Sequence, residues 1–346
     1  MHPNTSSLSR RDALRYLGLA GAAALLPSFA TRSAAAAPAP EASSGPTALP
    51  DLAGEQPGYC RFKIGDFDAV ALDDGGFGGP LDQAPWPKAD RAQLTAALAT
   101  AFLPADRFSI PINVLLVRMG AELVLVDTGC GPLHGPTNGK LRQRLAAIGV
   151  QPEQITAVIL THAHGDHFGG LLDPDTKAPV FARARHFIHR REFEFWTGSA
   201  PDLSTSGVPA EARAGAIARA QEYLNALRSR WQFIVPGDRL IDGLEIIDAP
   251  GHTPGHIALQ FSSGNTQLLH FVDTLHHHAI SFAHPDVPIA FDVQPDLGSA
   301  TRRRLLDRAA ADRTRLFGAH MPFPALGHVR KVGEGYEHVI EPWPTL

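Results

Sequence analysis

Cysteine is nearly absent from this sequence, with 2 residues among 346, whereas histidine occurs 17 times. Two cysteines cannot build a disulfide scaffold or a four-cysteine zinc site. Positive charge is not in excess, and a formal net charge of −4 offers no broad basic surface to nucleic acid. The chain also lacks the low hydrophobicity that is typical of disordered proteins, since 44% of its residues are hydrophobic. A globular chain remains, and its histidines are candidates for a metal site.

Three short signatures of enzyme families are absent as well. The sequence has no Gly-x-Ser-x-Gly nucleophile turn, no Gly-x4-Gly-Lys phosphate loop and no dinucleotide-binding glycine pattern. The glycine-rich run 75–79 lacks the spacing of a phosphate loop, and it indicates a flexible loop instead. None of these patterns therefore assigns a function to the chain.

The N-terminal apolar run, Leu17–Pro27, is far shorter than the ~20 residues that cross a bilayer. It lies between the pair Arg10-Arg11 and the alanine-rich run 34–37. This order is typical of a secretory signal peptide, and the paired arginines resemble a bacterial twin-arginine signal. We expect residues 1–37 to be a cleaved signal peptide, which predicts a periplasmic or secreted protein without a stable membrane anchor. The alternative is an amphipathic N-terminal helix.

The rest of the chain divides into a linker and one α/β domain. Residues 38–58 are rich in Pro, Ala, Ser and Gly, which indicates a flexible linker or arm. Helical patterns alternate with short apolar strands, which favours an α/β fold over residues 59–346. The expected helices are 140–148, 209–230 and 302–311, and the expected strands are 112–117, 123–126, 157–160, 244–247, 257–261 and 268–272. We expect Cys60 and Cys130 to be two separate buried thiols.

The most informative stretch is residues 161–170, directly after the strand 157–160. It contains His162, His164, Asp166 and His167, which offer the nitrogen and oxygen donors that zinc binds. In an extended segment His162 and His164 point the same way. Gly165 lets the chain turn, so that the next two side chains can reach a second position ~3.5–4 Å away. A single histidine is more often a core or surface residue, but this combination predicts a metal site.

This motif resembles that of the metallo-β-lactamase fold superfamily, and other residues at strand ends match the superfamily in order. The resemblance implies an αββα sandwich, in which two mixed sheets pack face to face with helices outside. It implies two metal ions and one open position for a water or hydroxide. It assigns the ligands as His162, His164 and His252 for the first metal, Asp166, His167 and His320 for the second, and Asp273 as the bridge. Asp127 would orient a ligand imidazole from behind.

Longer strings resemble the methyl parathion hydrolase-like enzymes, including 57–59, 125–129, 252–256 and 327–330. The resemblance implies two divalent ions, above all Zn²⁺ with Fe, Mn or Co as options, in a hydrolase that is often a homodimer. It implies a substrate pocket lined by aromatic residues, one of which Trp196 matches, with His134 at the position of another. We expect Phe168 and Phe282 to line this pocket as well. The implied reaction is hydrolysis of neutral hydrophobic esters by a metal-bridging hydroxide, with Asp166 and Asp273 in the catalytic centre. The substrates are lactones, aryl esters and organophosphate triesters. Because His134 replaces a Phe of these relatives, we rank lactones and aryl esters level with or above the triesters.

Several alternatives stay open. The same motif occurs in metallo-β-lactamases and in glyoxalase-II-like thioester hydrolases, and a non-catalytic metal-binding protein could also carry it. The run His276-His277-His278 follows Asp273 and could extend the metal site or gate the pocket. We favour the simpler interpretation of this run, a solvated loop.

Overall fold

The computed structural model describes residues 56–342. The predicted signal peptide, 1–37, lies outside these residues, and so does most of the predicted linker, 38–58. Residues 56–58 form neither helix nor strand. No helix in the described part of the chain is long and apolar enough to span a membrane.

Seven strands form the first sheet, in the order of the chain. The strands are β1 (Tyr59–Ile64), β2 (Phe67–Pro80), β3 (Arg107–Met119), β4 (Glu122–Val126), β5 (Ala157–Leu160), β6 (Arg185–His189) and β7 (Trp231–Ile234). Neighbouring strands from β1 to β4 are antiparallel, and those from β4 to β7 are parallel. The expected strands 112–117 and 123–126 lie in β3 and β4, which form a hairpin that pairs up to Met119 and Glu122 around a turn with Gly120 at φ +61°.

The second sheet is also mixed and has the order β13-β12-β11-β10-β9-β8. Its strands are β8 (Leu244–Asp248), β9 (Ile257–Ser263), β10 (Thr266–His270), β11 (Arg315–Phe317), β12 (Leu326–Val332) and β13 (Gly335–Ile340). Only β10 and β11 are parallel. The expected strand 268–272 ends earlier, because Val272 begins a short 3-10 helix over Val272–Thr274.

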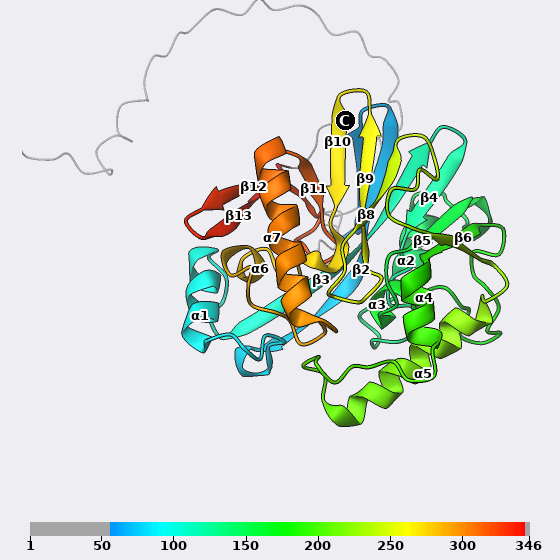
Figure 1. The fold of residues 1–346 in the computed structure, drawn as a ribbon. Coiled ribbons are helices and arrows are strands. Elements are labelled where there is room, and N and C mark those ends of the chain that lie inside the picture. Colours follow the sequence, from blue (N-terminus) through cyan, green and yellow to red (C-terminus); the bar gives the residue numbers. More distant parts are fainter. Residues whose placement is uncertain (1–55, 343–346) are drawn as a thin grey trace, which may run out of the picture. The chain divides into compact units, whose positions relative to one another are not determined.

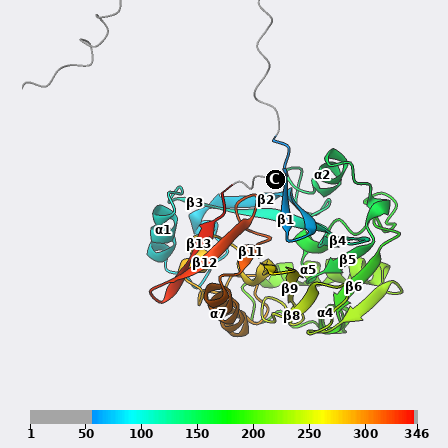
Figure 2. The ribbon, with the colours of Figure 1, turned by 90° about the horizontal axis from the view of Figure 1, so that it is seen from above.

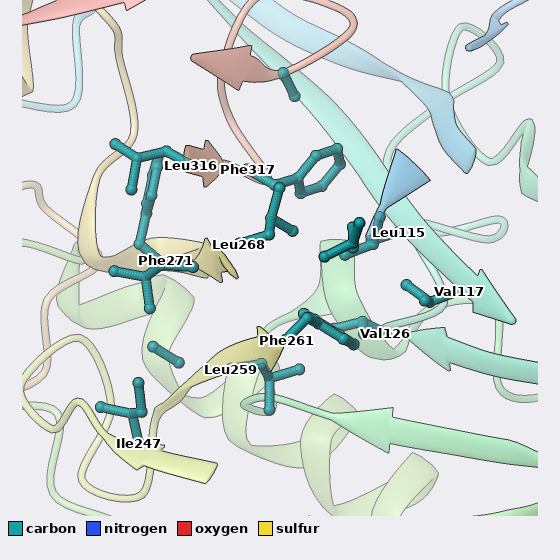
Figure 3. Close-up of a cluster of buried hydrophobic side chains, with 14 of the residues drawn as sticks. Leu115, Val117, Val126, Ile247, Leu259, Phe261, Leu268, Phe271, Leu316 and Phe317 are labelled. Atoms are coloured by element: carbon teal, nitrogen blue, oxygen red, sulfur yellow. The ribbon is translucent and has the colours of Figure 1, made fainter. Parts of the chain in front are cut away.

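The main core lies between the two sheets. Figure 3 shows Leu115 and Val126 of the first sheet near Leu259 and Phe261 of the second, and all four side chains are buried. Fully burying a side chain of this kind stabilises the fold by ~1.5–3 kcal/mol. The face-to-face packing confirms the predicted sandwich.

Helices cover the outer faces (Figures 1 and 2). The α-helices of residues 56–342 are α1 (Arg91–Thr100), α2 (Leu141–Ala147), α3 (Gly165–Phe168), α4 (Arg190–Thr197), α5 (Ala210–Ala226), α6 (Ile280–Ala283) and α7 (Pro295–Asp312). A second cluster of buried side chains joins α5 to β5, through residues such as Leu224 and Val158. The predicted helices 140–148, 209–230 and 302–311 correspond to α2, α5 and α7. The last begins earlier than predicted, with a proline in its first turn, where the missing N–H costs no bond.

The glycine-rich run 75–79 is not a flexible loop, so that prediction is wrong. These glycines belong to β2 and pair with β3 after a bulge between Asp73 and Gly75. A Cβ at Gly78 would come within 2.4 Å of the Phe108 carbonyl oxygen. The glycines therefore permit the backbones of β2 and β3 to approach closely. A glycine-rich composition does not by itself distinguish such a strand from a loop.

The prediction for the cysteines is confirmed. Cys60 and Cys130 are both free and buried. Burial raises the pKa of the Cys130 thiol, so this group stays protonated at neutral pH.

Candidate metal centre

The candidate ligands lie at the carboxyl ends of strands from both sheets. In the first sheet, β5 ends directly before the segment that carries His162 and His164. In the second sheet, His252 follows β8, Asp273 follows β10 and His320 follows β11. Residues far apart in the sequence thus meet at one edge of the sandwich.

The structure brings all the predicted ligands together in two groups, and a third group of Asp273, His276 and His320 overlaps both. One group has a ligand atom each from His162, His164, His252 and Asp273, and a second has Asp166, His167 and His320. Within each group these atoms lie within 4.8 Å of one another. The grouping matches the two metal positions expected from the sequence.

Asp273 lies between the two groups. Its Oδ1 is 3.1 Å from His167 Nε2, and its Oδ2 is 3.1 Å from His320 Nε2 and 3.3 Å from His252 Nε2. Three buried polar atoms here, Asp273 Oδ1, His167 Nε2 and His162 Nε2, form no hydrogen bond within residues 56–342, although the first two lie 3.1 Å apart. Buried polar atoms are rarely left unpaired. A pair of divalent cations would satisfy them, so the residues fit the implied metals.

Carboxylates behind the cluster orient the imidazoles, as is common at metal sites. Asp127 accepts hydrogen bonds from the Thr161 N–H and hydroxyl, both at 2.8 Å, and its Oδ2 lies 2.8 Å from His167 Nδ1. This is the role expected of Asp127. Asp292 Oδ1 lies 2.9 Å from His252 Nδ1 in the same manner. No motif surrounds Asp292, so its role was not predictable from the sequence.

Burial and mutual charges divide the cluster. Although burial opposes it, Asp273 raises the pKa of His167, His252 and His320, so a bound cation would replace the protons of these three imidazoles. Burial lowers the pKa of His162 and His164 well below the ordinary value of 6.5, which keeps both imidazoles neutral. Burial opposes ionisation of Asp273, but the imidazoles of His167 and His320 hold its pKa well below the ordinary value. Neutral imidazole and ionised carboxylate are the forms that ligate a metal.

The run His276-His277-His278 is not a solvated loop, so that prediction is wrong. His276 and His277 are each only 2% exposed. His276 Nε2 lies 3.2 Å from Asp273 Oδ2, and its ring stacks on His320 with centroids 5.2 Å apart. His277 packs edge-on against Trp86. The turn after Asp273 folds inward, so polar side chains that resemble a surface run become part of the interior.

A cavity of about 420 Å³ opens onto the ligand cluster. His164, Asp166, His252, Asp273 and His320 form its polar wall. The other walls are mostly apolar and consist of Phe77, Phe168, Trp196, Leu203, Val208, Ala212, Ala216, Phe291 and Val293, with His134, Ser206, Arg219 and His276 among them.

Three of the four predicted pocket residues, Trp196, Phe168 and His134, line this cavity. The prediction for Phe282 is wrong. Phe282 is not part of the cavity wall and belongs to the core cluster, where it packs against Phe271 and the His338 ring. The sequence analysis also missed the contribution of α5, whose alanines give no signal of a binding surface.

The sequence matches the family model described as the metallo-beta-lactamase superfamily over residues 109–320. Among curated proteins, it is 27% identical over 224 residues to a probable metallo-hydrolase of Mycobacterium tuberculosis, covering 57% of this chain and 67% of that protein. It is 30% identical over 102 residues to the N-acyl homoserine lactonase AiiB of Agrobacterium fabrum, covering 24% of this chain and 34% of that protein.

Two solved structures are similar over most of the chain. One is AidC, a dizinc quorum-quenching lactonase in complex with a hexanoyl-homoserine product, with a TM-score of 0.79 and 31% identity, covering 83% of this chain and 99% of AidC. The other is the hydrolase AbOPH, with a TM-score of 0.76 and 25% identity, covering 84% of this chain and 100% of AbOPH. Together with the ligand cluster, these matches establish that the chain belongs to the metallo-β-lactamase superfamily and is a metal-dependent hydrolase of that superfamily.

Proposed function

We propose that this protein hydrolyses neutral hydrophobic esters, with lactones as the main class and aryl esters and organophosphate triesters as further substrates. The observation that carries the proposal is the cavity of about 420 Å³, which has metal-ligating residues on one wall and apolar side chains on most of the others. Burial of apolar surface is favourable by about 25 cal/mol per Å². An uncharged ester with an acyl or aryl group fits such walls better than a highly charged substrate.

One set of residues would bind the cations, and another set would bind the substrate. His162, His164 and His252 would hold one cation, and Asp166, His167 and His320 the other, with Asp273 between them. Their donor set suits Zn²⁺, and also Fe, Mn or Co. When bound, such a pair supplies Lewis-acid activation of an ester oxygen and a water that ionises near neutral pH.

Substrate orientation would come from the aromatic wall. Trp196 is 1% exposed, and its ring lies edge-on to His164 with centroids 5.7 Å apart. Phe168 is similarly buried and packs on Tyr223 of α5. These contacts hold both rings in place, so the wall is formed before substrate binds, and an acyl or aryl group is directed toward the ligand cluster.

The similar proteins support lactones as the main class. AidC is described as a dizinc quorum-quenching lactonase, and AiiB as an N-acyl homoserine lactonase. Organophosphate triesters stay among the candidate substrates because strings such as 252–256 and 327–330 resemble the methyl parathion hydrolase-like enzymes.

The test is a panel of substrates with the zinc-loaded protein. We expect turnover of N-hexanoyl-homoserine lactone, dihydrocoumarin, aryl acetates and paraoxon, with the lactones fastest, and loss of all activity after complete chelation. The double variant His164→Ala with Asp166→Ala should be inactive on every ester. Turnover of nitrocefin or glutathione thioesters without any lactone hydrolysis would refute the proposal in favour of the alternative enzymes.

We also propose export by the twin-arginine route to the periplasm or medium, supported by the sequence 1–37. The substitutions Ala35→Leu and Ala37→Leu together should leave the precursor unprocessed, and normal processing would contradict this. A homodimer stays a prediction, which the mass of the protein in solution would test.

A further inference from the structure

We propose that Glu192 is a positioning residue of the metal centre, which ties together the two loops that carry the first group of histidines and connects them to the Trp196 wall of the cavity. This proposal rests on the proposed function in one respect only, namely that the centre binds cations. Glu192 lies in the first turn of α4 and is 0% exposed.

Both oxygens of this carboxylate are fully used by neighbouring donors. Oε1 accepts hydrogen bonds from the Ala163 N–H at 2.8 Å and the Trp196 indole N–H at 2.7 Å. Oε2 accepts from the Thr253 hydroxyl at 2.7 Å and the Gly255 N–H at 2.9 Å. An ionised carboxylate is an acceptor with about four lone-pair sites, so four donors match it completely.

The donors come from the two ligand-bearing loops. Ala163 lies between His162 and His164, and Thr253 directly follows His252. One loop leaves β5 of the first sheet and the other leaves β8 of the second. The Glu192 carboxylate therefore sets the distance between His162 and His164 on one loop and His252 on the other.

Close packing at α4 strengthens this constraint. A Cβ at Gly255 would come within 2.2 Å of the Glu192 backbone nitrogen, so the second loop lies directly against the helix. Trp196 follows Glu192 by one helical turn, and its ring borders His164. The same carboxylate thus fixes the ligand loops and the aromatic wall together.

Glu192 would act through these loops and not as a ligand. Its oxygens belong to none of the groups that could hold a metal within residues 56–342. Burial raises the pKa of Glu192, but its four hydrogen-bond donors favour the ionised carboxylate. These donors are neutral, so they do not cancel the negative charge behind the imidazoles. That charge favours a cation at the nearby centre, since screening is weak in the interior.

The test is zinc affinity without substrate, measured by competition with a chelator. Glu192→Gln keeps the shape but turns an NH2 group toward donors of one loop, and we expect zinc affinity to fall about 10- to 100-fold, as for other residues that orient ligands. Glu194→Gln is the matched control in the same helix, because Glu194 is 64% exposed and pairs only loosely with Arg190 at 3.9 Å. We expect its zinc affinity to stay within twofold of the wild type.

The outcomes are decisive for Glu192 and independent of substrate choice. A folded Glu192→Gln variant with zinc affinity within twofold of the wild type, even at a lower melting temperature, would overturn the proposal and leave a purely structural role. An equal loss in Glu194→Gln would overturn it as well. If Glu192→Gln does not fold, Thr253→Val decides, since it removes one donor and should weaken zinc binding at least threefold; an unchanged affinity would overturn the proposal. Failure of ester hydrolysis would affect only the proposed function.

Discussion

Replacing Arg302 should be among the most destabilising single changes outside the ligand set. Arg302 lies in α7, is 2% exposed and forms hydrogen bonds with buried acceptors on several segments. Its Nε donates to the Thr274 carbonyl at 2.6 Å, its Nη1 to the Pro285 carbonyl at 2.7 Å, and its Nη2 to Asp292 Oδ2 at 3.3 Å. Asp292 in turn holds His252, so the guanidinium supports the metal centre from behind.

The expected magnitude follows from the burial of both partners. Arg302→Met keeps the apolar stem but removes the guanidinium from Asp292, which is 0% exposed and keeps only His252 as a charged partner. Breaking a buried ion pair by removing one partner costs about 3–5 kcal/mol in the free energy of unfolding. The neighbouring Arg303 is the matched control, because its partner Asp286 is largely exposed. Arg303→Met should cost only about 0–1 kcal/mol, as exposed pairs do.

Urea denaturation with excess chelator measures this difference free of any contribution from bound metal. We expect the Arg302→Met midpoint to shift clearly and the Arg303→Met midpoint to shift little. Equal losses for the two variants, or a loss below about 1 kcal/mol for Arg302→Met, would refute the assignment of Arg302 as a buried structural cation.

Other predictions concern pH, backbone geometry and substrate size. Burial lowers the pKa of His186 to about 4, from an ordinary value of 6.5, so stability should fall as pH drops from 6.5 toward 4. The free energy of unfolding, measured by urea denaturation at several pH values, should then depend less on pH in His186→Phe, by up to about 1.4 kcal/mol per pH unit. An unchanged pH dependence would contradict the assignment. Gly131→Ala should destabilise severely, because φ is +50° and a Cβ would lie 2.0 Å from the Gly169 carbonyl oxygen. Gly120→Ala, with φ +61° and nothing within 4 Å, should cost only about 1–2 kcal/mol in the same denaturation assay. Ala216→Phe should raise KM for long-chain lactones about tenfold and leave short-chain lactones nearly unchanged, since the new ring would fill part of the cavity that Ala216 lines; equal effects on both would argue against an acyl site beside α5.

The ligand motif was predictable from the sequence because its geometry is local. His162, His164, Asp166 and His167 lie in one short segment after a strand, so their spacing alone indicates two metal positions. The hairpin of β3 and β4 and the helices α2, α5 and α7 follow in the same way from apolar periodicity. The later ligands, such as His320, required the resemblance to a known family, since a single histidine after a short strand has no distinctive pattern.

Other features depend on contacts between distant segments. His276 appeared to belong to a polar surface run, yet the turn after β10 folds it against Asp273 and His320. Glu192 looked like an ordinary helix residue, although its carboxylate joins loops from both sheets. Periodicity and motifs describe neighbours along the chain. Which buried charge meets which donor, and which alanine faces a cavity, is decided only when the two sheets pack together.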